Sequence, residues 1–159
     1  MEQKPKQVWI LIIIWIIIGI LFIGMFINET STYFGNLKFY EDSTFFTGNQ
    51  ANQFSTDLTF IYVVMVIFDI LIIIFSFLLV YTSFYVKKWT WILGIILSSA
   101  LLYTVYFGII GVGRAIINGQ LLEYFSNFIA VVYTIIIFII PCTIYLLTRP
   151  TVRKYFEKI

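Results

Sequence analysis

The chain has 159 residues, of which 61% are hydrophobic and 11% are charged, and its formal net charge is +2. An ordinary soluble domain carries about 25% charged residues, so this composition excludes a typical water-soluble protein and indicates one embedded in a membrane. The chain also lacks a basic cluster interleaved with aromatic residues, and we therefore predict no nucleic-acid partner.

Four long apolar runs follow one another along the chain. The hydrocarbon core of a bilayer is about 30 Å thick and a helix rises about 1.5 Å per residue, so about 20 apolar residues can span it. The runs are continuously apolar, which excludes the alternation of a transmembrane barrel. The sequence therefore predicts an all-α integral membrane four-helix bundle as one domain over residues 1–159. Its helices are expected over about 8–27, 58–86, 89–112 and 125–147.

The segment over 28–57 is predicted to be the one sizeable loop between the helices. It holds seven aromatic residues, whereas a solvated linker usually has few. We therefore expect this loop either to fold back as a cap on the helix ends or to dock another protein.

Basic residues are concentrated on one side of the predicted bundle. An excess of Lys and Arg marks the cytoplasmic side of a membrane protein. We therefore predict a multi-pass protein of the cytoplasmic (cell) membrane with both termini in the cytoplasm. The residues predicted to fix this topology or to contact lipid headgroups are Lys87, Lys88, Arg149, Arg153 and Lys154.

The chain offers little that could carry out catalysis. It has no His, and its single Cys is Cys142. Without His, the Ser-His-Asp constellation and the common transition-metal sites cannot be built. The sequence therefore predicts no catalytic residue, no metal site and no cofactor, and we expect the chain not to be an enzyme.

One carboxyl group, that of Asp69, lies inside the second apolar run, in "VMVIFDILIII". Polar residues recur from it in steps of seven, which share one helix face because they drift by only about 20° per step. A polar face of this kind is expected to point toward other helices rather than toward lipid. The predicted intramembrane polar contact consists of Tyr62, Asp69, Ser76 and Ser83.

The third apolar run carries small residues on one side, and small residues let helix backbones approach closely. We predict that this side packs as the complement of the polar face. Its members are Gly94, Ser98, Gly108 and Gly111. Candidate partners for the Asp69 carboxyl group at a similar depth are the hydroxyl groups of Tyr103, Thr104 and Tyr106.

Typical hydrogen-bond energies and the number of ionisable groups leave three interpretations of Asp69. A structural contact within or between subunits is favoured, although hydrogen bonds between membrane helices average only about 0.6 kcal/mol. A proton or ion relay usually contains several ionisable groups, and here the predicted spans contain one. The third interpretation is a contact with a partner subunit.

Three segments of the chain, "KPKQVWILIIIWIIIGILFI", "KKWTWILGIILSSALL" and "IYLLTRPTVRKYF", carry a family resemblance. Together they resemble a group of small, uncharacterised four-helix membrane proteins of bacteria and archaea that end in a Leu-Thr-Arg-Pro-x-Val motif. The resemblance implies a prokaryotic source and the same fold. It supplies no activity that could be carried over.

Two functions are consistent with these features. The first is a non-enzymatic accessory or structural subunit of a larger membrane complex, such as a respiratory or metal-dependent oxidase assembly. The expected partners are then the lipid bilayer and other membrane protein subunits. The alternative is a small oligomeric transporter or channel that uses Asp69.

Overall fold

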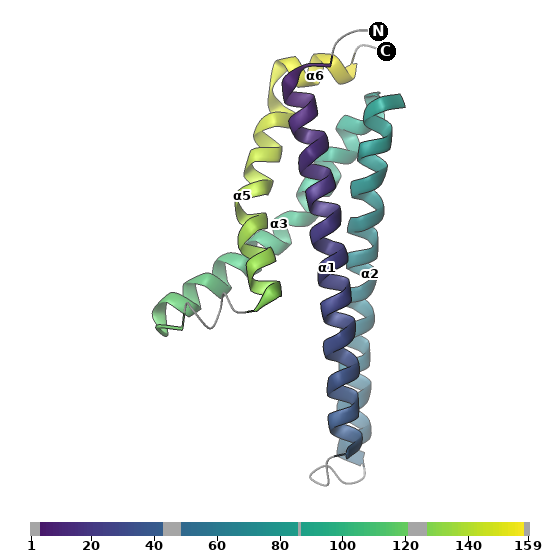
Figure 1. The fold of residues 1–159 in the computed structure, drawn as a ribbon, viewed down its shortest axis with the longest axis vertical. Helices are drawn as coiled ribbons and strands as arrows, with labels where there is room; N and C mark the ends of the chain where they lie inside the picture. The colour runs from purple at the N-terminus through teal and green to yellow at the C-terminus, as the bar shows by residue number, and fades with distance from the viewer. Residues whose placement is uncertain (1–3, 43–48, 86, 121–126, 158–159) are drawn as a thin grey trace.

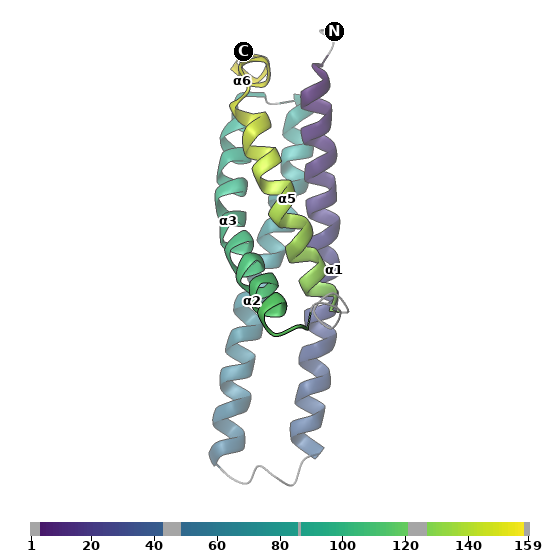
Figure 2. The same cartoon turned by 90° about the vertical axis from the view of Figure 1, so that its left-hand side faces the viewer.

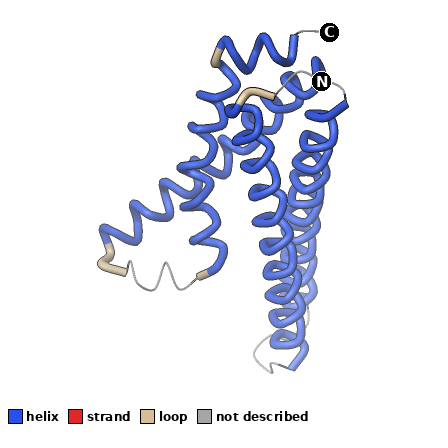
Figure 3. Tube along the Cα trace, turned by 45° about the horizontal axis from the view of Figure 1, so that its top comes forward, coloured by secondary structure: helices blue, strands red, loops and turns tan. Residues whose placement is uncertain are grey.

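The computed structural model describes residues 4–42, 49–85, 87–120 and 127–157, and the regular structure among them is helical (Figure 3). Four helices are long and apolar enough to cross a membrane, which confirms the predicted all-α bundle of a multi-pass membrane protein. A short fifth helix follows the last of them. The helices are α1 (Lys6–Asp42), α2 (Asn49–Tyr85), α3 (Lys87–Ile117), α5 (Phe128–Thr148) and α6 (Pro150–Glu157).

The long helices form two pairs (Figure 1). α1 packs along α2, and α3 packs along α5, while the contacts between the two pairs are less extensive. The start of α1 and the whole of α6 lie at one end of the molecule, which we call the terminal end. Toward the opposite end, the hairpin end, α3 tilts away from α1 and α2. The bundle is therefore closed at the terminal end and splayed at the hairpin end.

The structure corrects the predicted loop over 28–57, because α1 continues through Asp42 and α2 begins at Asn49. Each helix has 37 residues, or about 55 Å at about 1.5 Å per residue, whereas the hydrocarbon core is about 30 Å thick. Both helices extend well past the ends of α3 and α5 (Figure 2). The end of an apolar run indicates where a helix leaves lipid, but not where the helix itself ends. A helix satisfies its own backbone hydrogen bonds in water as well as in lipid. Residues 28–57 contain no Pro, so no proline in the predicted loop forces α1 to end earlier.

The expected aromatic cap is absent from the described part of this segment. Tyr33 stacks instead on Tyr62 of α2, with ring centroids 4.0 Å apart. Its hydroxyl group also lies 3.0 Å from Thr59 Oγ1. Phe34 is exposed, and Phe45 and Phe46 lie outside the described residues. Tyr33 thus joins the two helices to each other.

Smaller differences affect the other boundaries. α3 runs on to Ile117, past the predicted end at 112. α5 begins at Phe128, where the Asn127 side chain accepts a hydrogen bond from the Ile129 N–H group at 2.9 Å. The predicted start at 125 lies within 121–126, outside the described residues. Arg149 is extended, as expected before a proline, and Pro150 then opens α6, the position in a helix that tolerates proline best.

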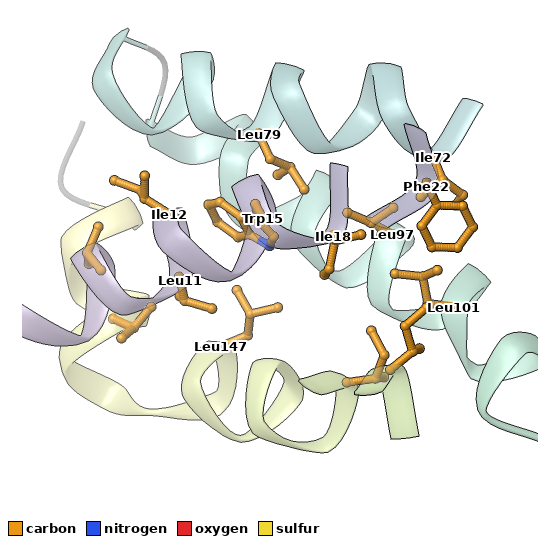
Figure 4. Close-up of a cluster of buried hydrophobic side chains, with 14 of the residues drawn as sticks. Leu11, Ile12, Trp15, Ile18, Phe22, Ile72, Leu79, Leu97, Leu101 and Leu147 are labelled. Atoms are coloured by element: carbon orange, nitrogen blue, oxygen red, sulfur yellow. The ribbon is translucent and has the colours of Figure 1, made fainter. Parts of the chain in front are cut away.

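The core of the bundle lies toward the terminal end and is centred on Trp15 of α1 (Figure 4). Leu79 of α2 and Leu147 of α5 point toward it from either side. Gly94 of α3 makes room for the indole ring, since a Cβ atom there would lie 3.3 Å from Trp15 Cζ2. α6 covers the terminal end with its buried side, formed by Val152, Tyr155 and Phe156.

The residues predicted to meet lipid headgroups lie at the terminal end where the structure describes them. Arg149, Arg153 and Lys154 are exposed. The Arg149 guanidinium lies 4.2 Å from the Tyr145 ring centroid, and that of Arg153 lies 5.5 Å from the Trp91 ring. Lys87 and Lys88 open α3, but their side chains lie outside those that the structure describes.

Candidate functional site

The predicted polar face of α2 is turned toward the inside of the bundle. Asp69, Ser76 and Ser83 are buried, and Tyr62 is half-buried. Ser83 Oγ donates to the Leu79 carbonyl at 2.6 Å, within its own helix. The Tyr62 hydroxyl lies 3.1 Å from Thr30 Oγ1 of α1. Two of the four residues therefore have their polar groups satisfied, and the other two, Asp69 and Ser76, each keep a side-chain oxygen without a partner among the described residues.

The small residues of α3 do not form the expected complement of this polar face. A Cβ atom at Gly108 would lie 3.0 Å from Ile137 Cδ1, and one at Gly94 would lie 3.3 Å from Leu147 Cδ2, so both glycines pack against α5. Ser98 donates to the Gly94 carbonyl at 2.8 Å, and Gly111 lines a separate cavity beside α5. The reason is the path of the chain: α3 and α5 form one hairpin, and α2 pairs with α1.

Asp69 lines a cavity of about 410 Å³ between the four long helices. A second carboxyl group, that of Glu29 on α1, lines the same cavity. The remaining walls are mostly apolar and include two methionines, Met25 and Met65. Five aromatic residues complete them: Phe22, Phe68, Tyr103, Phe107 and Tyr133. An apolar cavity of this size with a few converging polar groups is typical of a small-molecule site.

The two carboxyl groups are buried and incompletely paired. The exposed fractions of Asp69 and Glu29 are 2% and 8%. Asp69 Oδ2 and Glu29 Oε2 have no hydrogen-bond partner among the residues that the structure describes. An unpaired polar group removed from water costs about 1–3 kcal/mol. Of the predicted partners, Tyr103 and Thr104 line the cavity, whereas Tyr106 does not line it and is exposed.

Glu29 was missed from the sequence because it lies beyond the first apolar run, in the predicted loop. The sequence does indicate Glu29 when the first helix is continued past its predicted end at residue 27. Phe22, Met25 and Glu29 are spaced by three and four residues, so they share one helix face. All three are buried and line the cavity. The apolar face of α1 thus continues into a carboxyl group where lipid contact ends.

The two acids lie at different depths. At about 1.5 Å per residue, Glu29 is about 34 Å along α1 from Lys6, and Asp69 is about 24 Å along α2 from Tyr85. In a bilayer core of about 30 Å that begins at the terminal end, Glu29 lies near the opposite boundary and Asp69 lies deeper.

A smaller cavity leads toward Glu29 from the hairpin end. Its volume is about 190 Å³, and it shares Glu29 and Met65 with the larger cavity. Its other polar lining residues include Thr32 and Asn36, which are exposed. Most of its lining surface is apolar, so Glu29 borders two mostly apolar cavities, the second of them toward the hairpin end.

The larger cavity also opens sideways, between α2 and α3. The cavity-lining residues on these helices include Val64, Met65, Tyr103 and Phe107, all of them exposed. The exposed fraction of Tyr103 reaches 64%. Toward the hairpin end, α3 tilts away from α1 and α2 (Figure 1).

The rest of the described chain has a further cavity of about 490 Å³ beside α5, but no other buried carboxyl group. Residues 4–42, 49–85, 87–120 and 127–157 hold no group of three or more His, Cys, Asp or Glu side chains able to hold a metal ion. Cys142 is exposed on α5, next to Pro141, and not packed as a small core residue. Comparison with protein families, with curated proteins and with solved structures finds no match to this chain.

Proposed function

We propose that this chain is a non-enzymatic subunit of a larger membrane assembly, in which another membrane protein subunit covers the mouth between α2 and α3. The observation that supports this is the position of two buried carboxyl groups in a cavity that opens toward lipid. Ionisable groups within a membrane face a bundle interior or a water-filled cavity, because hydrocarbon cannot solvate them. A neighbouring subunit would supply polar partners and exclude lipid. A respiratory or metal-dependent oxidase assembly remains the expected kind of complex, with metal ligands on its other chains.

A photoreactive residue at the mouth tests this proposal. With benzoylphenylalanine in place of Tyr103, irradiation of native membranes is expected to give a protein–protein adduct. The matched control is Ile20, which is also exposed and lies at a similar depth on α1. An adduct of twice the chain's mass identifies a second copy, and any other mass identifies a different subunit. Equal adducts at both positions, or none at residue 103, would contradict the proposal.

We propose further that the protein belongs to the cytoplasmic membrane, with both termini in the cytoplasm, as the loop charges predict. Asn36→Cys, on the exposed part of α1, is then expected to react with an impermeant maleimide added to intact cells. Thr151→Cys on α6 is expected to react only after permeabilisation. Both variants need Cys142→Ser, since Cys142 is exposed. The reverse labelling pattern would reverse the orientation. Membership of the family that ends in Leu-Thr-Arg-Pro-x-Val stays a prediction.

The second candidate function is a small oligomeric transporter that uses Asp69. One structural observation supports this candidate: Glu29 supplies a second carboxyl group in the same cavity. Glu29 near the bilayer boundary and Asp69 deeper inside would attract a cation in two steps. Entry from the hairpin end would pass the exposed residues Thr32 and Asn36, which line the smaller, mostly apolar cavity beside Glu29.

A further inference from the structure

We propose that the cavity lined by Asp69 and Glu29 binds an organic cation, a protonated amine that carries an apolar, aromatic-sized body. This proposal deepens the transport role by naming its class of solute, and it rests on that candidate function. The site itself is defined by a volume of about 410 Å³ and by two carboxyl groups at its wall.

The unpaired oxygens are the first argument for a ligand. Asp69 Oδ2 and Glu29 Oε2 are buried and lack partners among the described residues, and both residues line the cavity. A carboxylate accepts hydrogen bonds, and a protonated amine offers N–H donors with the opposite charge. Charge-assisted hydrogen bonds of this type are about twice as strong as neutral ones. An amine would therefore satisfy the atoms that the protein leaves unpaired.

The composition of the walls separates an organic cation from a metal or alkali ion. A divalent ion such as Ca²⁺ takes about six to eight oxygen ligands, whereas most of this cavity is lined by apolar atoms. Aromatic faces attract organic cations within about 6 Å of the ring centroid, most clearly alkylammonium groups. Five aromatic side chains and two methionines are suited to an apolar body, and methionine adapts to irregular shapes.

The size of the cavity is consistent with the same ligand class. Small-molecule sites range from about 300 to 1,000 Å³, so about 410 Å³ accommodates a molecule with one or two rings. The sideways mouth and the smaller cavity beside Glu29 both border it, one on the lipid side and one toward the hairpin end. An amphiphilic amine can reach the cavity by either route.

Dibenzylamine and dibenzyl ether provide a matched pair of probes for the purified protein in detergent. The two molecules have nearly the same shape, but only the amine is protonated at pH 7. We expect dibenzylamine to bind and to raise the melting temperature, and dibenzyl ether to do neither. Asp69→Asn and Glu29→Gln are each expected to weaken amine binding at least about tenfold. Glu157→Gln, an exposed acid on α6 that pairs with Arg153, is the control and should leave binding unchanged.

Three outcomes would overturn the inference, and they differ in whether the transport candidate falls with it. If sodium or potassium chloride stabilises the protein in an Asp69-dependent way and dibenzylamine does not, the ligand class is wrong but the transport candidate stands. If no cation has an Asp69-dependent effect, the ligand class and the transport candidate both fall. Equal binding of the amine and the ether would mean that the cavity is an apolar pocket that does not recognise the positive charge. Circular dichroism of each variant checks its helix content, so a loss of binding is not confused with misfolding.

Discussion

Replacing Trp15 with alanine is expected to lower the free energy of unfolding by about 3–5 kcal/mol, the usual cost of truncating a large core aromatic side chain. Trp15 is fully buried and lies between α2 and α5, with α3 approaching closely at Gly94 (Figure 4). Its removal would leave a cavity at the point where both helix pairs meet. Reversible unfolding in mixed detergent micelles, followed by circular dichroism, measures the change.

Trp15→Phe is the matched control for this substitution. Trp15 Nε1 has no hydrogen-bond partner among the described residues, so the indole N–H group adds nothing that phenylalanine would lose. We expect a change below about 1.5 kcal/mol, as for other core substitutions that keep most of the volume. If Trp15→Ala costs less than about 1 kcal/mol, Trp15 is not at the centre of the core. If Trp15→Phe lowers the free energy of unfolding as much as Trp15→Ala does, the indole N–H group has a partner in the membrane.

The long apolar runs were sufficient to predict the fold class, because lipid demands helices of a known minimum length. They could not predict where α1 and α2 end. Beyond the bilayer the helix is governed by local stop signals and by packing between the two helices. The stack of Tyr33 on Tyr62 is one such contact, and it joins residues that the sequence assigned to a loop and a helix.

The candidate site was predictable only in part, for the same reason. The heptad spacing placed Asp69, Ser76 and Ser83 on one face of α2, and that face is buried. Which helix this face contacts depends on which helices pair with each other. The hydropathy of the sequence does not determine that pairing. The contacts of Gly94 and Gly108 with α5 illustrate this, since their spacing is equally suited to any neighbour. Glu29 could enter the site only after α1 had been extended past the apolar run.

Replacing Asp69 with leucine is expected to raise the free energy of unfolding of the isolated protein by about 1–3 kcal/mol. A buried polar group without a partner costs about that amount, and leucine has the same branched arrangement of side-chain heavy atoms and no polar atom, while its larger methyl groups extend into the adjoining cavity. Residues kept for binding often reduce stability in this way. Asp69→Asn is the companion variant. It keeps a polar group in the same apolar surroundings, so its gain in stability is expected to be smaller than that of leucine.

This substitution separates the interpretations of Asp69 that the sequence left open. If the carboxyl group is a structural contact between helices, leucine removes a favourable hydrogen bond and the free energy of unfolding falls. If it is a binding group, leucine stabilises the empty protein and abolishes the stabilisation by dibenzylamine. A ligand site therefore predicts that the free energy of unfolding of the empty protein rises while the stabilisation by dibenzylamine is lost. A structural contact does not predict this combination. A stabilised variant that still binds the amine would contradict the proposed site, because amine binding would then not depend on Asp69.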